Sequence, residues 1–313
     1  MTKFASTSME DRDGQIWING EMVNWRDAKF HMLAHTLHHG LGVFEGVRAY
    51  LSKDGRPAIF RLEEHTKRLF RSAHIMQIPL PYEESDLFDA QIEVMRRNSL
   101  EEAYLRPIVF YGGDRMGVSA QGNRVHVSIA AWLWENYLGE TAKADGVKLK
   151  ISSFTRHHVN STMCKAKVCG HYVNSVLANQ EAKQLGFDDA MLLDVHGYVA
   201  EATTSNVFVI IDGDVFTPPL HSVLAGVTRD SVIKLLEHSG IPCTERTMTR
   251  DDLYIADEIF LTGTASEITP VIEVDNRSIG GGRPGKVSKH AQELYFQAVR
   301  GEISDFHHWL THI

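Results

Sequence analysis

The order of strand-like and helix-like segments is the feature that most limits how this chain can fold. The chain opens with alternating polar and apolar residues around Asn19-Gly20, which predicts a β-hairpin over residues 15–25. After it we expect strands at 47–50 and 58–60, amphipathic helices at 62–76 and 82–98, and strands at 104–111 and 125–132. Two helices framed by strands predict an α+β domain with an antiparallel sheet.

The second half is richer in strands. The pattern breaks after residue 133, and an alternating strand begins again at 147–153. Beyond it we expect a helix at about 167–185, strands at 190–194, 207–211 and 214–217, a helix at 228–238, a strand at 258–262 and a helix at 287–299. A chain of 313 residues suits two domains. The break predicts a small domain at 1–133, a linker at 134–144 and a large domain at 145–313.

Composition excludes several classes of protein. Hydrophobic residues make up 43% and charged residues 23%, as in soluble globular proteins. The net charge of -8 argues against a nucleic-acid partner and against an anionic membrane surface. Three cysteines do not form a disulfide framework, which favours a reducing compartment. With no apolar leader and no apolar run of about 18 residues, we expect a cytoplasmic protein.

One segment has the features of a phosphate site. Gly226-Val-Thr-Arg-Asp230 opens the helix expected at 228–238. Free backbone N–H groups and the positive end of the helix dipole attract an anion at such a helix start. Taken alone, however, the segment fits a simple helix cap better, with Thr228 capping its own helix.

Two further segments carry candidate catalytic or binding groups. Lys167 stands at the expected start of a helix, and a buried lysine has a depressed pKa and can form a Schiff base. Lys165 is an equal rival on spacing alone, and a surface lysine is the simpler explanation for both. Glu201 is the one acid in an expected loop of small neutral residues, where it can pair with a protonated ring nitrogen or lie exposed at a strand end.

Two other patterns do not lead to a site. Gly280-Gly-Gly-Arg-Pro-Gly-Lys286 is similar to a nucleotide-binding P-loop, but Val287 stands where a hydroxyl residue has to bind magnesium. The histidines at 31–39 and 157–158 have no acidic or thiol partner at ligand spacing beside them. We therefore expect no metal site.

Taken together, the segments resemble the branched-chain amino acid aminotransferase family of the fold-type IV enzymes, which depend on pyridoxal 5'-phosphate (PLP). The resemblance covers nearly the whole chain. Its best markers, in family order, are Val43–Arg48, Ala103–Pro107, Lys167 with Tyr172, Glu201–Phe208, Gly226–Asp230 and Gly263–Pro270. It implies a small α+β N-terminal domain and a larger β-rich pseudo-barrel C-terminal domain.

The resemblance assigns cofactor residues. The family's Schiff-base lysine lies five residues before a tyrosine, which favours Lys167 with Tyr172 over Lys165. Tyr172 then bonds the ring hydroxyl oxygen, Glu201 pairs with the ring nitrogen, and Arg68 binds the phosphate with its fork of N–H groups. The other implied cofactor residues are Leu224 against the ring, and Val227, Thr228 and Thr264 at the phosphate.

The resemblance also implies substrate residues and an assembly. The residues implied for the apolar side-chain pocket are Phe44, Trp134, Tyr137 and Tyr172. The residues implied to bind the α-carboxylate are Tyr104, Thr264 and Ala265. Arg106 is implied to bind the side-chain carboxylate of glutamate, and Val118 to come from a partner subunit. A homodimer or homohexamer is therefore expected. His39 departs from the pattern, because it stands where many members have a tyrosine lining the side-chain pocket, and it makes the preferred side chain uncertain.

The implied reaction moves amino groups between Leu, Ile or Val and 2-oxoglutarate, through ping-pong kinetics. An aminodeoxychorismate lyase shares the fold type, but Arg106 and the aromatic cluster speak against it. A D-amino acid aminotransferase should lack the Ala103–Pro107 pattern. A PLP-binding protein without activity is disfavoured because the implied cofactor residues are all present.

Overall fold

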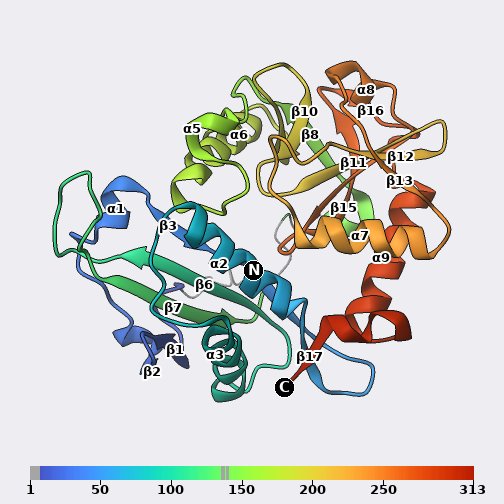
Figure 1. The fold of residues 1–313 in the computed structure, drawn as a ribbon. Coiled ribbons are helices and arrows are strands. Elements are labelled where there is room, and N and C mark those ends of the chain that lie inside the picture. Colours follow the sequence, from blue (N-terminus) through green and yellow to red (C-terminus); the bar gives the residue numbers. More distant parts are fainter. Residues whose placement is uncertain (1–7, 135–137, 139–140) are drawn as a thin grey trace, which may run out of the picture. The chain divides into compact units, whose positions relative to one another are not determined.

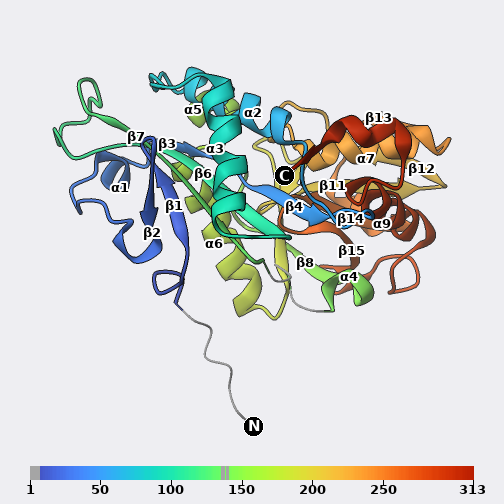
Figure 2. The same cartoon turned by 90° about the horizontal axis from the view of Figure 1, so that it is seen from below.

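The computed structural model describes residues 8–134, 138 and 141–313, and the chain forms two compact units (Figures 1 and 2). The first unit comprises the residues up to Leu133 together with Val168–Gly170 and Leu310–Ile313. The second comprises Trp134–Lys167 and His171–Trp309. The predicted linker is grouped with the second unit, and part of it lies outside the described residues, so the predicted domain limits stay a prediction.

The first unit is built on an antiparallel sheet. Its eight strands, counted over the described residues, run in the order β17-β5-β4-β6-β7-β1-β2, with β3 beside β6. They are β1 Gln15–Ile18, β2 Glu21–Asn24, β3 Gly42–Phe44, β4 Val47–Leu51, β5 Pro57–Phe60, β6 Ala103–Tyr111, β7 Val125–Trp132 and β17 Leu310–His312. The predicted hairpin is confirmed: β1 pairs with β2 around Asn19 and Gly20, whose φ angles of 52° and 99° suit a two-residue turn.

Two long helices pack against this sheet. They are α2 Leu62–Ile75 and α3 Glu84–Arg97, and both were predicted (Figure 1). Each buries one apolar stripe, which includes Leu69 on α2 and Leu87 on α3. The shorter elements are η1 Trp25–Asp27 and α1 His35–His39.

The second unit contains a nine-stranded mixed sheet, again counted over the described part of the chain. The strand order is β10-β9-β8-β15-β14-β11-β12-β13, with β16 beside β15. The strands are β8 Val147–Ile151, β9 Asp189–Leu193, β10 Val199–Ala202, β11 Asn206–Ile211, β12 Asp214–Thr217, β13 Cys243–Glu245, β14 Glu258–Gly263, β15 Glu267–Val274 and β16 Arg277–Ser278. The helices and turns are α4 Ala142–Asp145, α5 Val159–Thr162, η2 Cys169–His171, α6 Tyr172–Gln184, α7 Val227–His238, α8 Arg250–Tyr254, α9 Lys286–Val299 and η3 Ser304–Trp309.

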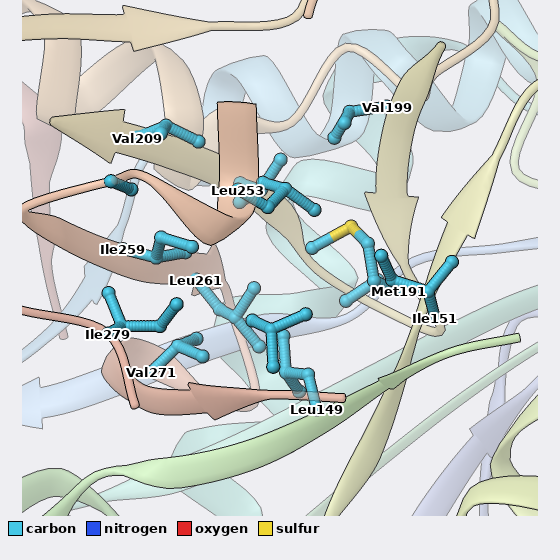
Figure 3. Packing of buried hydrophobic residues seen from close by; sticks show 14 of the residues in the cluster. Leu149, Ile151, Met191, Val199, Val209, Leu253, Ile259, Leu261, Val271 and Ile279 are labelled. Atoms are coloured by element: carbon cyan, nitrogen blue, oxygen red, sulfur yellow. The ribbon is translucent and has the colours of Figure 1, made fainter. Parts of the chain in front are cut away.

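Side chains from distant strands of this sheet meet in one core (Figure 3). Val199 from the edge strand β10, Leu149 from β8, Val209 from β11 and Val271 from β15 belong to the same buried cluster. Strands far apart in the order can share a core only if the sheet curls. This confirms the predicted fold class, with a β-rich pseudo-barrel after a smaller α+β part.

The structure corrects three expectations. The helix expected at 167–185 begins at Tyr172, so Lys167 lies in the irregular segment before it. Glu201 lies within strand β10, not in a loop. Strand β15 was not predicted, because it contains Pro270. That proline pairs with Phe260 of β14 and lies just before Val271, where pairing with β8 begins, so its missing N–H breaks no bond to β8.

The structure also bears on the membrane question. Among the described residues, no helix is long and apolar enough to span a bilayer.

Candidate active site

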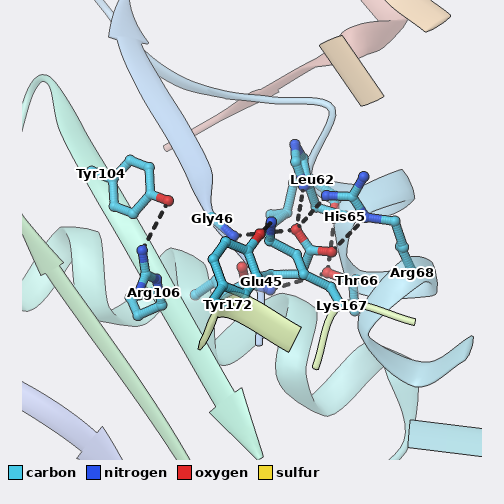
Figure 4. Close-up of polar contacts among 11 residues, drawn as sticks. Glu45, Gly46, Leu62, His65, Thr66, Arg68, Tyr104, Arg106, Lys167 and Tyr172 are labelled. Atoms are coloured by element: carbon cyan, nitrogen blue, oxygen red, sulfur yellow. Dashed lines mark hydrogen bonds and ion pairs between the residues drawn. The ribbon is translucent and has the colours of Figure 1, made fainter. Parts of the chain in front are cut away.

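Lys167 is held against a phenol (Figure 4). Its Nζ donates a hydrogen bond of 2.5 Å to the hydroxyl oxygen of Tyr172, the first residue of α6. Lys167 is half-buried between the buried residues Ala166 and Val168, whereas Lys165 is exposed. The structure therefore favours Lys167 as the reactive amine, where the spacing alone left both lysines open.

Glu201 is a buried carboxylate with a guanidinium and two amide N–H groups among its partners. Its Oε1 lies 2.9 Å from Nη2 of Arg156, and its Oε2 accepts from Asn206 Nδ2 at 3.2 Å and from the backbone N–H of Leu224 at 3.1 Å. Arg156 is buried too, and its Nε has no hydrogen-bond partner among the described residues. Bonds from a cation and two amides stabilise the ionised form of Glu201 and fix its direction.

Close backbone approach holds the surroundings of Glu201 in place. A Cβ on Gly226 would lie 2.0 Å from Oδ1 of Asn206, the residue that also donates to Glu201. Only glycine therefore fits at position 226 with Asn206 in this place. A bond of 2.9 Å between the hydroxyls of Ser205 and Ser266 joins the turn before β11 to the turn before β15.

The start of α7 has the properties of an anion site. Its N-cap is Gly226, which offers no side-chain cap, so first-turn N–H groups are not satisfied by a capping side chain. Thr228 lies inside the helix and is buried, so the explanation of Thr228 as a plain cap is wrong. In β14, Oγ1 of Thr262 is buried without a hydrogen-bond partner among the described residues. A helix start without a capping side chain favours a bound phosphate, because its first backbone N–H groups and the helix dipole attract an anion.

In the first unit, Arg106 is packed between aromatic side chains. Its guanidinium carbon lies 4.8 Å from the ring centre of Phe44 and 5.3 Å from that of Tyr104, and its Nη2 donates to the Tyr104 hydroxyl at 3.1 Å. The Nε of Arg106 is buried and has no hydrogen-bond partner in the described part of the chain. A cation among aromatic rings with an unsatisfied N–H is suited to a carboxylate ligand.

Arg68 belongs to a buried cluster with Glu45 and His65 (Figure 4). Its Nε and Nη2 donate to the two carboxylate oxygens of Glu45 at 2.6 and 2.9 Å. Arg68 lies on α2, and Glu45 lies in the short link between β3 and β4. The guanidinium is thus fixed by a bidentate pair.

The remaining predicted residues lie as follows. His39 is exposed at the end of α1, and its ring stacks on that of His35 at 4.2 Å. Val118 is 88% exposed. Trp134, Leu224, Thr264 and Ala265 are half-buried, and Tyr137 lies outside the described residues.

Sequence reasoning missed three residues that the structure brings into these clusters. Glu45 was seen only as part of the Val43–Arg48 marker, and His65 and Arg156 had no assigned role. An acid inside an otherwise apolar strand pattern, and a histidine three residues before Arg68 on one helix face, are signals that could have found the first two. Among the described residues, no cluster of His, Cys, Asp or Glu is suited to a metal ion.

These groups fit PLP on chemical grounds. PLP needs an amine for its aldehyde, donors for its phosphate and a carboxylate for its ring nitrogen. In the second unit, groups of these kinds are the amine of Lys167, the start of α7, which has no side-chain cap, and the carboxylate of Glu201. In the first unit, taken by itself, the guanidinium of Arg68 is fixed by Glu45 and is a donor of the kind that binds phosphate.

Comparisons with known proteins agree on one family. Residues 42–274 match the family of class IV amino-transferases. The branched-chain-amino-acid aminotransferase of Pseudomonas aeruginosa is 52% identical over 304 residues, which cover 97% of this chain and 99% of that protein.

Solved structures of such enzymes are similar over the same length. The crystal structure of the Escherichia coli branched-chain amino acid aminotransferase has 43% identity and a TM-score of 0.93, covering 96% of this chain and 99% of that one. A second branched-chain amino acid aminotransferase, complexed with N-(5'-phosphopyridoxyl)-L-glutamate, has 43% identity and a TM-score of 0.92, covering 96% and 98%. The chain therefore belongs to the class IV amino-transferases and, within them, to the PLP-dependent branched-chain-amino-acid aminotransferase family of fold type IV.

Proposed function

We propose that this enzyme transfers the amino group of L-leucine, L-isoleucine or L-valine to 2-oxoglutarate, giving branched-chain 2-oxo acids and L-glutamate. The observation that carries the proposal is the amine of Lys167, held 2.5 Å from the Tyr172 hydroxyl. The names of the relatives support the donor, and a relative's complex with a phosphopyridoxyl-glutamate compound supports glutamate as the product.

We propose the following cofactor residues. Arg68, the N–H groups of Val227 and Thr228, and the hydroxyl of Thr264 bind the phosphate. Leu224 packs against the ring, and Tyr172 bonds the ring hydroxyl oxygen. The start of α7, which has no side-chain cap, and the fixed fork of Arg68 support these roles.

When bound, PLP supplies the electron sink that stabilises negative charge at the substrate Cα. Glu201 holds a proton on the ring nitrogen, and Arg156 keeps Glu201 ionised while it does so. Lys167 takes the proton from Cα of the amino acid and returns it during the transfer. Tyr172 keeps the amine of Lys167 in place.

The substrate residues are proposals of the same kind. The apolar side-chain pocket is formed by Phe44, Trp134, Tyr137 and Tyr172, and His39 lines its edge. The α-carboxylate is bound by Tyr104, Thr264 and Ala265. Val118 comes from a second copy of the chain. Arg106 binds the distal carboxylate of glutamate and 2-oxoglutarate. Its ring contacts and its unsatisfied Nε support dual recognition, because one cation among aromatic rings serves an acidic and an apolar side chain in turn.

The proposal also includes the oligomeric state of the enzyme and its location in the cell. The role given to Val118 requires a homo-oligomer, a homodimer or a homohexamer, and we propose that it works in the cytoplasm. Its partners are small amino acids and 2-oxo acids.

The test is production of L-glutamate by the purified holoenzyme from 2-oxoglutarate and L-leucine, L-isoleucine or L-valine. Double-reciprocal plots at several 2-oxoglutarate concentrations should be parallel, as ping-pong kinetics require. Use of D-leucine in place of L-leucine would make it a D-amino acid aminotransferase. Pyruvate release from aminodeoxychorismate without any transamination would make it a lyase.

A further inference from the structure

Glu45 is a fully buried acid with no role in the reaction described so far. Its side chain lies in the first unit and is 0% exposed. Its backbone N–H donates to the carbonyl of Pro107 at 2.8 Å, which fixes the residue beside β6. Burying a carboxylate is costly unless it is paired, so its partners should explain why it is there.

Both oxygens of Glu45 bind side chains of α2. Oε1 accepts from Arg68 Nε at 2.6 Å, and Oε2 accepts from Arg68 Nη2 at 2.9 Å and from His65 Nδ1 at 2.8 Å. Burial alone would raise the pKa of Glu45, but the charge of Arg68 and the bonds from both partners hold it well below its usual range. Burial lowers the pKa of His65, although the neighbouring Glu45 opposes this shift. The cluster is thus a buried Arg68–Glu45 ion pair with His65 as its third member.

This geometry fixes the plane of the guanidinium. A carboxylate on the edge that carries Nε and Nη2 leaves one orientation for the opposite edge, which carries Nη1. His65 fixes the carboxylate in turn, from the same face of α2 that carries Arg68. An arginine without such support has to be ordered when it binds a ligand.

We propose that Glu45 is a positioning residue, which holds Arg68 so that its opposite edge binds the phosphate of PLP. The proposal rests on the proposed role of Arg68. Two effects of Glu45 on phosphate binding oppose one another: its negative charge repels the phosphate, whereas its fork orients the guanidinium. The proposal states that orientation is the larger effect, so that removal of the charge weakens phosphate binding.

The measurement is the ratio of the dissociation constants of pyridoxal and PLP, determined for each apoenzyme by spectroscopic titration. Both ligands carry the aldehyde, so the ratio isolates the phosphate. In Glu45→Gln we expect the ratio to fall about tenfold, as for a lost hydrogen bond to a charged group. In Arg68→Ala the ratio should fall further. In the double variant with Glu45→Gln and Arg68→Ala, the ratio should be nearly the same as in Arg68→Ala alone.

Two variants complete the design. Glu64→Gln removes a carboxylate that pairs with another arginine of the same region, Arg61, and should leave the ratio unchanged. Glu45→Asp keeps the charge but is too short to hold both nitrogens and His65 together, so it should lower the ratio about threefold. If Glu45→Gln does not fold, Glu45→Asp still tests whether Glu45 positions Arg68.

The outcomes separate the two proposals. If Glu45→Gln and Glu45→Asp leave the ratio unchanged or raise it, Glu45 does not position Arg68. Equal weakening of both ligands, with a lower melting temperature, would overturn the proposal in favour of a purely structural ion pair. If instead Arg68→Ala leaves the ratio unchanged, the phosphate role of Arg68 fails, and the positioning role fails with it, while transamination itself can still stand.

Discussion

Each unit of the chain contains an arginine–glutamate pair in which both side chains are buried, and in the roles proposed above the arginine of one pair and the glutamate of the other bind the cofactor. In the first unit Arg68 is held by Glu45, whose side chain is almost completely enclosed. In the second unit Glu201 is held by Arg156, whose Nε has no hydrogen-bond partner among the described residues. Both pairs are short, at 2.6 and 2.9 Å.

If both proposed roles hold, the same kind of ion pair supports an anion-binding site in one unit and a cation-binding site in the other. A buried pair contributes little to stability, because desolvation offsets the attraction between the charges. Its value lies in fixing one partner. Glu45 is bonded by two side chains of α2 and fixes a cation, which we propose binds a phosphate. Glu201 is bonded by Arg156, Asn206 and a backbone N–H, which fix an anion that we propose pairs with a ring nitrogen.

The largest expected effect tests the cofactor on which both roles depend. Lys167→Ala should lower the rate of transamination at least about a thousandfold, because the proton at Cα loses its base. The matched control is Lys165→Ala, which removes an exposed lysine two residues away and should keep near-normal turnover. Loss of activity in the control alone would reverse the assignment of the two lysines.

The next effect distinguishes the two carboxylates by the kinetic constant that each changes. Glu201→Gln should lower kcat about a hundredfold at saturating PLP, because the proton on the ring nitrogen is no longer stabilised. Glu45→Gln should keep most of kcat at saturating PLP. Arg156→Gln should lower kcat about tenfold, since Glu201 retains Asn206 and the backbone donor. If Glu201→Gln and Glu45→Gln lowered kcat equally, the two carboxylates would not differ in their effect on the reaction, and the proposed difference between the two pairs would be wrong.

A smaller effect concerns how the free energy of unfolding depends on pH, through two histidines near Arg156. Burial, and then the charge of Arg156, lower the pKa of His157 to about 3 and that of His171 to about 4. Unfolded histidines take up a proton near pH 6.5, as expected for exposed side chains, so below about pH 6.5 the unfolded chain binds more protons. The free energy of unfolding should therefore fall as the pH is lowered from about 6.5 towards 4.

The variant His157→Gln should make that fall shallower, measured as the melting temperature against pH. The exposed His196 provides the control, and His196→Gln should keep the slope of the parent chain. An unchanged slope in His157→Gln would mean that this ring is protonated in the folded state. The surroundings of the Arg156–Glu201 pair would then carry one more positive charge.

The smallest effect concerns the side-chain pocket. His39→Tyr should change the ratio of kcat/KM for L-leucine and L-phenylalanine by about two- to fivefold, the range of a modest change in an apolar pocket. His38→Tyr, on the preceding exposed position of α1, should leave the ratio unchanged. The same ratio in both variants would mean that His39 does not line the pocket.

The sequence predicted what local patterns determine. The α2 and α3 helices follow from their apolar stripes, and the first hairpin follows from Asn19-Gly20. Strand β17 was missed, because residues at the end of the chain pair with β5, which lies far earlier in the sequence, and no local signal encodes that pairing. The same limit applies to the site: Lys167 and Tyr172 are close in sequence, whereas the pair of Glu45 and Arg68 depends on how a strand link meets a helix.

The most direct test of the whole account is the absorbance spectrum of the purified protein before and after L-leucine is added. We predict a band near ~410–420 nm that converts to one near ~330 nm as PLP accepts the amino group, a change that D-leucine should not cause. Absence of any visible band after PLP is added would contradict the cofactor assignment, and with it the roles given to Lys167, Glu201 and Arg68. A band that ignores L-leucine but responds to another amino donor would contradict the substrate alone.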